Sequence, residues 1–503
     1  MSTDGILRNG GLLPLSQVPE LDVAAFRHRV LEATTQRGRL TALFGTPAGD
    51  RVRLVAVVAW PDSGLLSVAT TLVREEYPAL TPECPAAHLF ERELAETWRL
   101  RPAGHPWLKP VRGETPRRSG PEVWPGQSTP AAAAGTDFFQ VSGEEVHEVA
   151  VGPVHAGIIE PGHFRFQCHG ETVHHLEIAL GYQHRGVERR LTGGPDRRSA
   201  HYAETLAGDT TVGHGLAYAQ IIEALAGCRV PARAQVIRGI ALELERLANH
   251  VGDLGALAGD VGYLPTLSYC GRIRGDLLNL TAALCGSRFG RGLVRPGGVA
   301  FTVDRELAGS VGERLVTSRE EAEAAVDLLW DSPSVMARFE GTGVLEREVA
   351  EAIGLVGVAT RACGLPRDVR HDHPLGIWAL VQVPVATWDT GDVLARAHVR
   401  WQEIQRSAAF CLEQLAALPE GPTTVPVNGL APDHLAVSLV EGWRGEICHV
   451  ALTDPQGRFA QYKVVDPSFH NWFGLALALR QEQISDFPLC NKSFNLSYCG
   501  HDL

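Results

Sequence analysis

Cysteine thiolates are the groups in this chain that could do the most distinctive chemistry, because a thiolate binds soft metal ions. Zinc and iron–sulfur sites usually draw their thiolates from closely spaced pairs, since a tight turn aims two sulfur atoms at one metal. The sequence has ten cysteines but no CxxC pair, and the closest two are Cys490 and Cys499. The spacing therefore predicts that most of them are small buried hydrophobic residues in a reducing compartment.

The elements that would position any site divide into a small N-terminal part and a larger remainder. Between them, residues 115–137 alternate proline with glycine and include a run of four alanines. Such a composition cannot build a core and is typical of a semi-rigid linker. We therefore expect one domain at residues 1–114, a linker at 115–137 and a second domain at 138–503.

The N-terminal part has the pattern of an α+β domain. Residues 51–60 and 65–72 suggest strands joined by a turn, and residues 19–34 and 85–98 suggest helices. The second helix carries three glutamates, which we expect to form a solvated face: Glu91, Glu93 and Glu96.

The larger part begins with strand-like segments at residues 149–165 and 167–177 and then becomes helical. The clearest helix is expected at residues 231–257, where apolar residues recur at helical spacing and Pro231 suits the first turn. Further helices are expected at 214–226, 272–284, 318–330 and 393–418, and a final β segment at 435–462. The predicted fold class is α+β: a small α+β domain, then a mainly helical bundle with β-rich segments near both ends.

Composition excludes several classes of function. The formal net charge of −12 leaves no basic stripe to neutralise phosphates, which argues against nucleic-acid binding. The sequence contains no run of about 18 apolar residues, so it predicts no membrane span. The N-terminus also lacks the layout of a signal peptide. The sequence therefore predicts a cytoplasmic or peripheral membrane protein.

Five colinear motifs carry a family resemblance: residues 181–188 (GYQHRGVE), 233–238 (RAQVIR), 244–250 (LERLANH), 440–446 (VEGWRGE) and 466–472 (DPSFHNW). They resemble the nickel–iron hydrogenase large subunits and the complex I quinone-site subunit, in the energy-converting branch typified by formate hydrogenlyase. The resemblance implies a hydrogenase large-subunit-like fold for residues 138–503.

The N-terminal domain resembles a second, smaller protein. Residues 77–82 (YPALTP), 90–93 (FERE) and 104–106 (GHP) are similar to the complex I subunit that partners the quinone-site protein. In formate hydrogenlyase-type complexes these two proteins are fused, and the linker lies where such a fusion would place it.

The resemblance also shows what this chain has lost. Catalytic hydrogenases hold nickel with four thiolates, two from a CGxC motif and two from a C-terminal DPCxxC motif, because nickel chemistry needs soft ligands. In this sequence the cysteine positions of the first motif fall on Ala207 and Thr210, and those of the second on Ser497 and Gly500. Cys499 is one position out of register, so the resemblance implies that the nickel site is lost.

A harder metal ion is an alternative occupant of these positions. Asp209, Thr210, Ser497 and Cys499 would be its ligands. Hydroxyls and a single carboxylate make a poor ligand set for any such ion. We therefore expect no metal site in this chain.

Two residues of the first β-rich segment are candidates for proton chemistry. Glu160, in IEPGH, matches the family glutamate that passes protons to and from the active site, although a surface glutamate in a Pro-Gly turn is the alternative. Complex I binds a quinone head group with a histidine of this segment and a tyrosine near the lost CGxC motif. His155 lies several residues before that histidine position, and the tyrosine position falls on Gly208. A bound quinone is therefore an open possibility, with His155 as a pocket residue.

Three basic residues match family positions near the partner's iron–sulfur cluster or the site pocket: His250, Arg185 and Arg444. Each has a structural alternative. His250 could be a packed histidine bonded to backbone, and either arginine could be a buried ion-pair partner, for example of Glu188 or Glu446.

The resemblance implies a subunit of a membrane-associated, complex I-like and hydrogenase-like oxidoreductase complex. Such a complex couples electron transfer, linked to NAD(P)H or quinone, to ion translocation. Its expected partners are an iron–sulfur small subunit and antiporter-like membrane subunits, with this chain on the cytoplasmic face and no cofactor bound by the chain itself. The alternatives are a non-catalytic structural or coupling subunit, and a working hydrogenase with an unusual metal site, which the missing thiolates disfavour.

Overall fold

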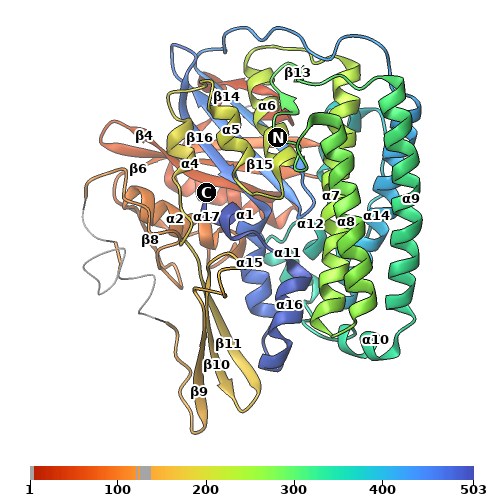
Figure 1. The fold of residues 1–503 in the computed structure, drawn as a ribbon. Coiled ribbons are helices and arrows are strands. Elements are labelled where there is room, and N and C mark those ends of the chain that lie inside the picture. Colours follow the sequence, from red (N-terminus) through yellow and green to blue (C-terminus); the bar gives the residue numbers. More distant parts are fainter. Residues whose placement is uncertain (1–4, 121–122, 125–137) are drawn as a thin grey trace.

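The structure, a computed structural model, describes residues 5–120, 123–124 and 138–503 (Figure 1). Its helices and sheets confirm the predicted α+β class. Two sheets form the centre of the molecule, a bundle of long helices packs on one side, and a three-stranded arm projects from the body (Figure 1). Most of the predicted linker, residues 121–122 and 125–137, lies outside the described residues.

The first sheet is built by the N-terminal residues. Its strand order is β1-β6-β5-β4, with β3 pairing in parallel with β6. The bounds are β1 Ile6–Arg8, β3 Glu20–Leu21, β4 Arg39–Ala48, β5 Arg51–Trp60 and β6 Leu65–Val73, with helices α1 Val23–Thr35 and α2 His88–Trp98. Strand β5 coincides with the predicted range 51–60. Helix α1 begins later than expected, because Asp22 caps it by accepting a hydrogen bond from the backbone N–H of Ala25 at 2.8 Å.

The prediction of a solvated glutamate face on α2 is wrong, because all three glutamates are buried. Glu91 accepts hydrogen bonds from the backbone N–H groups of Leu80 and Thr81, and Glu96 accepts several from residues 111–114. Glu93 forms ion pairs with Arg112 and Lys463. Buried carboxylates persist where donors satisfy them, and here the donors come from loops and strands that the helix pattern does not reveal.

The second sheet joins the two ends of the chain. Its order is β16-β15-β14-β2, with bounds β2 Leu12–Pro14, β14 His434–Glu441, β15 Glu446–Thr453 and β16 Phe459–Val465. The short N-terminal strand β2 pairs antiparallel with β14. The side-chain amide of Asn9 stabilises this pairing. Its Nδ2 donates to the carbonyls of His373 and Leu439, and its Oδ1 accepts from the N–H of Leu439.

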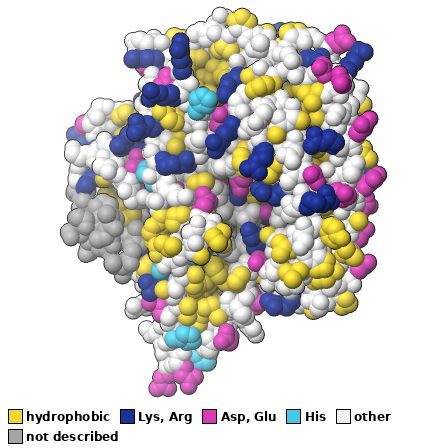
Figure 2. Space-filling model, viewed as in Figure 1, with side chains coloured by type: hydrophobic (Ala, Val, Ile, Leu, Met, Phe, Trp, Pro, Cys, Tyr) yellow, Lys and Arg dark blue, Asp and Glu magenta, His cyan; other side chains and the backbone are white. Residues whose placement is uncertain are grey.

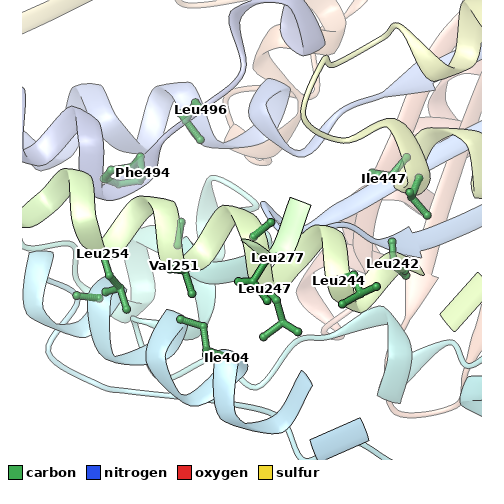
Figure 3. Packing of buried hydrophobic residues seen from close by; sticks show 14 of the residues in the cluster. Leu242, Leu244, Leu247, Val251, Leu254, Leu277, Ile404, Ile447, Phe494 and Leu496 are labelled. Carbon is green, nitrogen blue, oxygen red and sulfur yellow. The ribbon is translucent and has the colours of Figure 1, made fainter. Parts of the chain in front are cut away.

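Long helices form the bundle: α6 Thr211–Leu225, α7 Ala232–Asp260, α8 Leu264–Cys285, α9 Arg305–Trp330 and α14 Val393–Ala416. Helix α7 lies between α8, α14 and the C-terminal segment, and its leucines pack against all three (Figure 3). Phe494 and Leu496 of that segment are buried against α7 (Figure 3). The apolar periodicity that predicted α7 is therefore the surface that holds the end of the chain in place.

The arm consists of β9 Val146–Val151, β10 His163–His169 and β11 Thr172–Ala179, in the order β11-β10-β9. One continuous strand over residues 149–165 was expected, but residues 152–162 form a loop because Pro153 and Pro161 interrupt the ladder. Acidic and histidine side chains gather at the tip of the arm (Figure 2), where His169 lies 3.5 Å from Glu145.

Shorter elements complete the fold. They are α4 Val187–Leu191, α5 Ser199–Glu204, α10 Pro333–Phe339, α11 Arg347–Ala352, α12 Gly357–Arg361, α13 Val369–Asp372, α15 Pro467–Ala478, α16 Phe487–Phe494, α17 Tyr498–Asp502, β7 Glu76–Pro78, β8 Arg101–Ala103, β12 Val294–Arg295 and β13 Gly298–Val299. Within the described ranges, no helix combines the length and apolar character that crossing a bilayer requires.

Candidate functional site

A tight hairpin turn between β14 and β15 presents Trp443 and Arg444 to the segments that correspond to the two lost metal motifs. The turn is closed by hydrogen bonds between Gly442 and Gly445, and Gly445 is required there because its φ of 142° favours glycine. A Cβ atom on Gly445 would also lie 2.8 Å from the backbone of Gly357. The close approach of the two backbones fixes where the turn points.

Arg444 joins the two motifs directly. Its guanidinium makes a bidentate ion pair with Asp209, with Nη1–Oδ1 and Nη2–Oδ2 distances of 2.6 and 2.8 Å. Its Nε donates to the backbone carbonyl of Asn495 in the C-terminal motif. Burial alone would raise the pKa of Asp209, but the charge and hydrogen bonds of Arg444 outweigh it and hold this pKa below its ordinary value. A guanidinium therefore ties together the segments that four thiolates and a metal would join.

Each of the four positions that the resemblance equates with nickel ligands has a structural role of its own. Ala207 is fully buried, and the Thr210 hydroxyl is hydrogen-bonded to Asp209 and Arg444. The Ser497 hydroxyl caps α17 by accepting from the N–H of Gly500 at 2.9 Å. At Gly500 itself, an added Cβ would lie 2.6 Å from a carboxylate oxygen of Asp466.

Nickel does not fit this arrangement. The positions supply one hydroxyl from threonine and one from serine in place of four sulfur atoms, and Asp466 blocks a side chain at residue 500. Over residues 5–120, 123–124 and 138–503, no three His, Cys, Asp or Glu side chains are arranged to hold a metal ion.

Glu160 lies at the edge of the same site, against the C-terminal motif. One of its oxygens accepts a hydrogen bond from the backbone N–H of Tyr498 at 3.2 Å, and the Cys499 thiol is hydrogen-bonded to it. Burial, and after it the Glu160 carboxylate, raises the pKa of Cys499 to about 11, so this thiol stays protonated at neutral pH. The neighbouring Gly208 is exposed, and a Cβ atom built on it meets nothing within 4 Å. The site is therefore open on the side of Gly208.

The last two residues are held by the motif at residues 181–188. The Asp502 carboxylate accepts from the backbone N–H groups of Gly181 and Gln183 at 2.8 and 2.9 Å. The carbonyls of Asp502 and Leu503 accept from His184 and from the N–H of Arg185. This anchoring uses protein groups only, so the C-terminal motif is held in place without a metal.

The structure places His155 and Arg185 beside the site rather than at its centre. His155 donates from Nε2 to the carbonyl of Gly162 at 2.8 Å and so closes the loop at residues 152–162. Arg185 is exposed, and its guanidinium donates to the carbonyls of Thr205 and Leu206, just before Ala207. Arg185 therefore steadies the turn that leads into the first motif.

His250 lies deeper, in a buried ionic cluster. Its Nε2 is 2.8 Å from Glu403, so the expected bond to backbone is replaced by one to a carboxylate. Burial lowers the pKa of His250 even though Glu403 opposes this shift, which leaves the ring neutral. The other members of the cluster are Arg246, Arg361, Arg370, Glu243, Asp368 and Glu441.

The alternative role of Arg444, a buried ion-pair partner, is present, but its partner is Asp209. The two glutamates suggested as examples pair elsewhere: Glu446 with Arg39, and Glu188 with Lys463 at 3.1 Å. The functional residue that sequence reasoning missed is Asp466, which caps α15 and lies behind Gly500. Its position before a proline and a serine is the signal of a helix N-cap, but nothing in that signal indicates contact with residue 500.

Comparison with known proteins places these observations in context. Residues 260–433 match the family model described as respiratory-chain NADH dehydrogenase, 49 Kd subunit. The chain is 30% identical over 450 residues to formate hydrogenlyase subunit 5 of Escherichia coli (strain K12), which covers 85% of this chain and 77% of that relative. The carbon monoxide-induced hydrogenase of Rhodospirillum rubrum is 30% identical over 353 residues, 69% of this chain and 97% of the relative. NADH-quinone oxidoreductase subunit 4 of Thermus thermophilus is 29% identical over 369 residues, 68% of this chain and 90% of the relative.

Proposed function

We propose a function from one premise: this chain belongs to the superfamily of complex I 49-kDa subunits and hydrogenase large subunits, in the energy-converting branch that includes formate hydrogenlyase. We infer that it is a subunit of a membrane-associated oxidoreductase complex of that kind. The complex couples electron transfer, linked to NAD(P)H or quinone, to ion translocation, and this subunit works without nickel.

The observation that carries the proposal is the ion pair between Arg444 and Asp209. It lies where a metal would join the two motifs, and its partners come from both of them. The scaffold is therefore kept closed by protein groups alone. No step of the proposed chemistry passes through nickel.

Glu160 supports a role in proton transfer at this site. Its carboxylate is half-buried, contacts the C-terminal motif and lies beside the open side of the site at Gly208. An acceptor that takes up electrons there, such as a quinone, also takes up protons, and a carboxylate in this position can supply them. His250 and Arg185 are proposed to lie on the side of the chain that faces the partner's iron–sulfur cluster.

The partners are proposed to be an iron–sulfur small subunit and antiporter-like membrane subunits, on the cytoplasmic face of the membrane. An exposed apolar loop beside the site supports a surface that other subunits cover. Val154, Ile158 and Ile159 of this loop are 75%, 87% and 54% exposed. Apolar side chains gathered on one loop are typical of interaction surfaces.

A second candidate, a non-catalytic coupling subunit, is favoured by the same ion pair. A closed scaffold without a metal can transmit conformational change between partners without doing chemistry. The two candidates differ in whether Glu160 matters for electron transfer.

Metal analysis tests the loss of nickel. The complex should be purified from native membranes through a tag on this chain and analysed by inductively coupled plasma mass spectrometry. We expect iron from the partner subunit and nickel far below one atom per chain. Nickel near one atom per chain would overturn the proposal.

Replacing Glu160 with glutamine separates the two candidates. We expect electron transfer from reduced methyl viologen to decylubiquinone to fall by about 100-fold, because the amide cannot exchange a proton. Glu145→Gln, at the exposed tip of the arm, serves as the matched control and should retain full activity. An unchanged rate in an intact Glu160→Gln complex would favour the coupling subunit instead.

A further inference from the structure

A line of four buried polar groups runs through the interior behind the site. The Tyr462 hydroxyl lies 2.9 Å from Nδ1 of His449, and Nε2 of His449 lies 3.1 Å from Nδ1 of His214. Nε2 of His214 lies 3.0 Å from Oδ2 of Asp466. All four side chains are at most 1% exposed, and they come from β16, β15, α6 and the start of α15.

With both rings neutral, the partners of each ring allow only one direction of donation. The other oxygen of Asp466 accepts from the N–H of Ser468, so the carboxylate is an acceptor throughout. His214 therefore donates from Nε2 and accepts at Nδ1, which requires His449 to donate from Nε2 and accept at Nδ1. Tyr462 then donates its hydroxyl proton to His449. Burial, and after it the neighbouring His214, holds the pKa of His449 well below its ordinary value, in keeping with a neutral ring.

The Asp466 end of the line reaches the candidate site. The carboxylate lies directly behind Gly500, at the position of the second lost cysteine, so that a Cβ there would be 2.6 Å from it. The charge of Arg444 also acts on this carboxylate, and together with His214 it outweighs burial and keeps the pKa of Asp466 low. Any side chain larger than glycine at residue 500 would separate the line from the site.

The Tyr462 end continues toward solvent. The ring of Tyr462 lies against that of Tyr218, with centroids 6.3 Å apart. The Tyr218 hydroxyl is hydrogen-bonded to Ser199, whose hydroxyl donates to Asp196 at 3.1 Å. Asp196 is exposed. Within the described residues the two phenols are joined by ring packing and by no hydrogen bond, so the line of hydrogen bonds is interrupted between them.

Packing alone does not require these groups. Burying a polar side chain costs free energy unless it is hydrogen-bonded, and apolar residues of similar shape fill a core equally well. Here four polar groups in a row satisfy one another, and both ends lead to places where protons are available or consumed. A continuous hydrogen-bonded chain with one polarity is the arrangement that passes protons along its length.

We propose that Tyr462, His449, His214 and Asp466 form a proton relay that carries protons from solvent near Asp196 to the candidate site. In one passage, the Tyr462 O–H bond breaks as an N–H bond forms at Nδ1 of His449. The Nε2 proton of His449 passes to Nδ1 of His214, and the Nε2 proton of His214 passes to Asp466. The Tyr462 phenolate regains a proton from the Tyr218 side, and Asp466 gives its proton to the acceptor. Each imidazole ring then turns about its Cβ–Cγ bond, so that its N–H again faces Asp466 and the next proton can pass. The relay rests on the proposed function, which supplies electrons through the iron–sulfur partner to that acceptor.

Replacing Tyr462 with phenylalanine tests the relay in the purified complex. With reduced methyl viologen as donor, we expect decylubiquinone reduction to fall at least about tenfold and its solvent isotope effect to rise. Ferricyanide reduction should stay at the wild-type rate, because ferricyanide accepts electrons without protons. Tyr202→Phe, a partly buried tyrosine packed on the same hydrophobic cluster, is the matched control. Wild-type quinone reduction in Tyr462→Phe would overturn the relay.

A second measurement keeps the relay testable if the wild-type complex does not reduce quinone, which would refute the proposed function itself. Nitrogen-15 NMR of the full chain labelled at histidine reports the tautomer of each ring. We expect His449 to be neutral and protonated at Nε2 from pH 6 to 8, His214 to carry a proton on Nε2, and Tyr462→Phe to shift Nδ1 of His449. A charged His449 ring, or a proton on its Nδ1, would overturn the relay.

Discussion

Replacing Arg444 with methionine is expected to lower the free energy of unfolding by about 2–4 kcal/mol and to loosen the C-terminal motif. Methionine keeps much of the packing on Trp443, whose ring lies 3.9 Å from the guanidinium carbon. It leaves Asp209 without its cation beside Asp466, and it leaves the carbonyl of Asn495 without its donor. The expected loss is below that for a fully buried pair because the Asp209 side chain is 33% exposed. Urea unfolding followed by circular dichroism measures the change.

The loss of stability caused by Arg444→Met should become smaller as the pH falls. Arg444 holds the pKa of Asp209 below its unfolded value of about 3.9, so the pair stabilises the fold above that pH and loses this effect as the pH falls through the folded pKa. The difference between wild type and Arg444→Met should therefore be full at pH 7 and smaller below about pH 4.

Two further variants make this result specific. Asp209→Asn combined with Arg444→Met should cost less than the sum of the single changes by about 2 kcal/mol, because the double variant leaves no unpaired charge. Arg458→Met removes an exposed pair with Asp454 and should change stability by less than about 0.5 kcal/mol. Additive losses in the double variant would show that the ion pair does not hold the two motifs together.

Replacing Arg361 with methionine is expected to have the largest effect on stability, a loss of about 4 kcal/mol or more. Arg361 is 0% exposed and pairs with Glu403 and Glu441 at 2.7 Å each, with Asp368 at 3.7 Å. Its removal leaves three carboxylates close together in the interior of the bundle. The measurement is the urea midpoint of the helical signal, with Arg272→Met on the exposed face of α8 as control.

The balance of charges in the buried ionic cluster around Arg361 suggests a second variant. Its three arginines face four carboxylates, so the cluster is short of one positive charge unless one of its groups holds a proton. Burial, and then repulsion from Asp368, raises the pKa of Glu441 to about 7, which makes it the carboxyl of this cluster that takes up a proton most easily. Both oxygens of Glu441 accept hydrogen bonds, one from Arg361 and one from the N–H of Val369. Glu441→Gln removes the charge but turns its amide N–H₂ toward one of these donors, so it should cost about 1–3 kcal/mol. A loss as large as that of Arg361→Met would show that Glu441 is fully ionised.

Periodicity located the long helices and the hairpin of the first sheet, because these elements depend on apolar spacing along one segment. Helices α8 and α9 nevertheless begin well before the expected residues 272 and 318. Strand β5 and helix α14 begin where the pattern begins. The glutamates of α2 were predicted wrongly for the opposite reason. A glutamate on a helix has the same spacing whether water or Lys463, 370 residues away, satisfies it.

The residues of the candidate site were likewise predictable only where one segment of the sequence is enough to locate them. The family motifs located Arg444, Ser497 and Gly500, but spacing could not identify Asp209 as the partner of Arg444, 235 residues away. The hydrogen bonds that link His214 with His449 and with Asp466 likewise join residues more than 200 positions apart. Contacts of this kind depend on how the sheet packs on α6, which the sequence of either element alone does not specify.

The pairing of β2 with β14 has a consequence for synthesis. Asn9 and its partner Leu439 are 430 residues apart, so a ribosome working at about 5–20 residues per second makes the second about 20–90 seconds after the first. During that interval the N-terminal segment has emerged, but its partner strand does not yet exist. Translation of the last seventh of the chain therefore completes the part that was made first, and a product truncated before β14 would carry an unpaired edge at its N-terminal end.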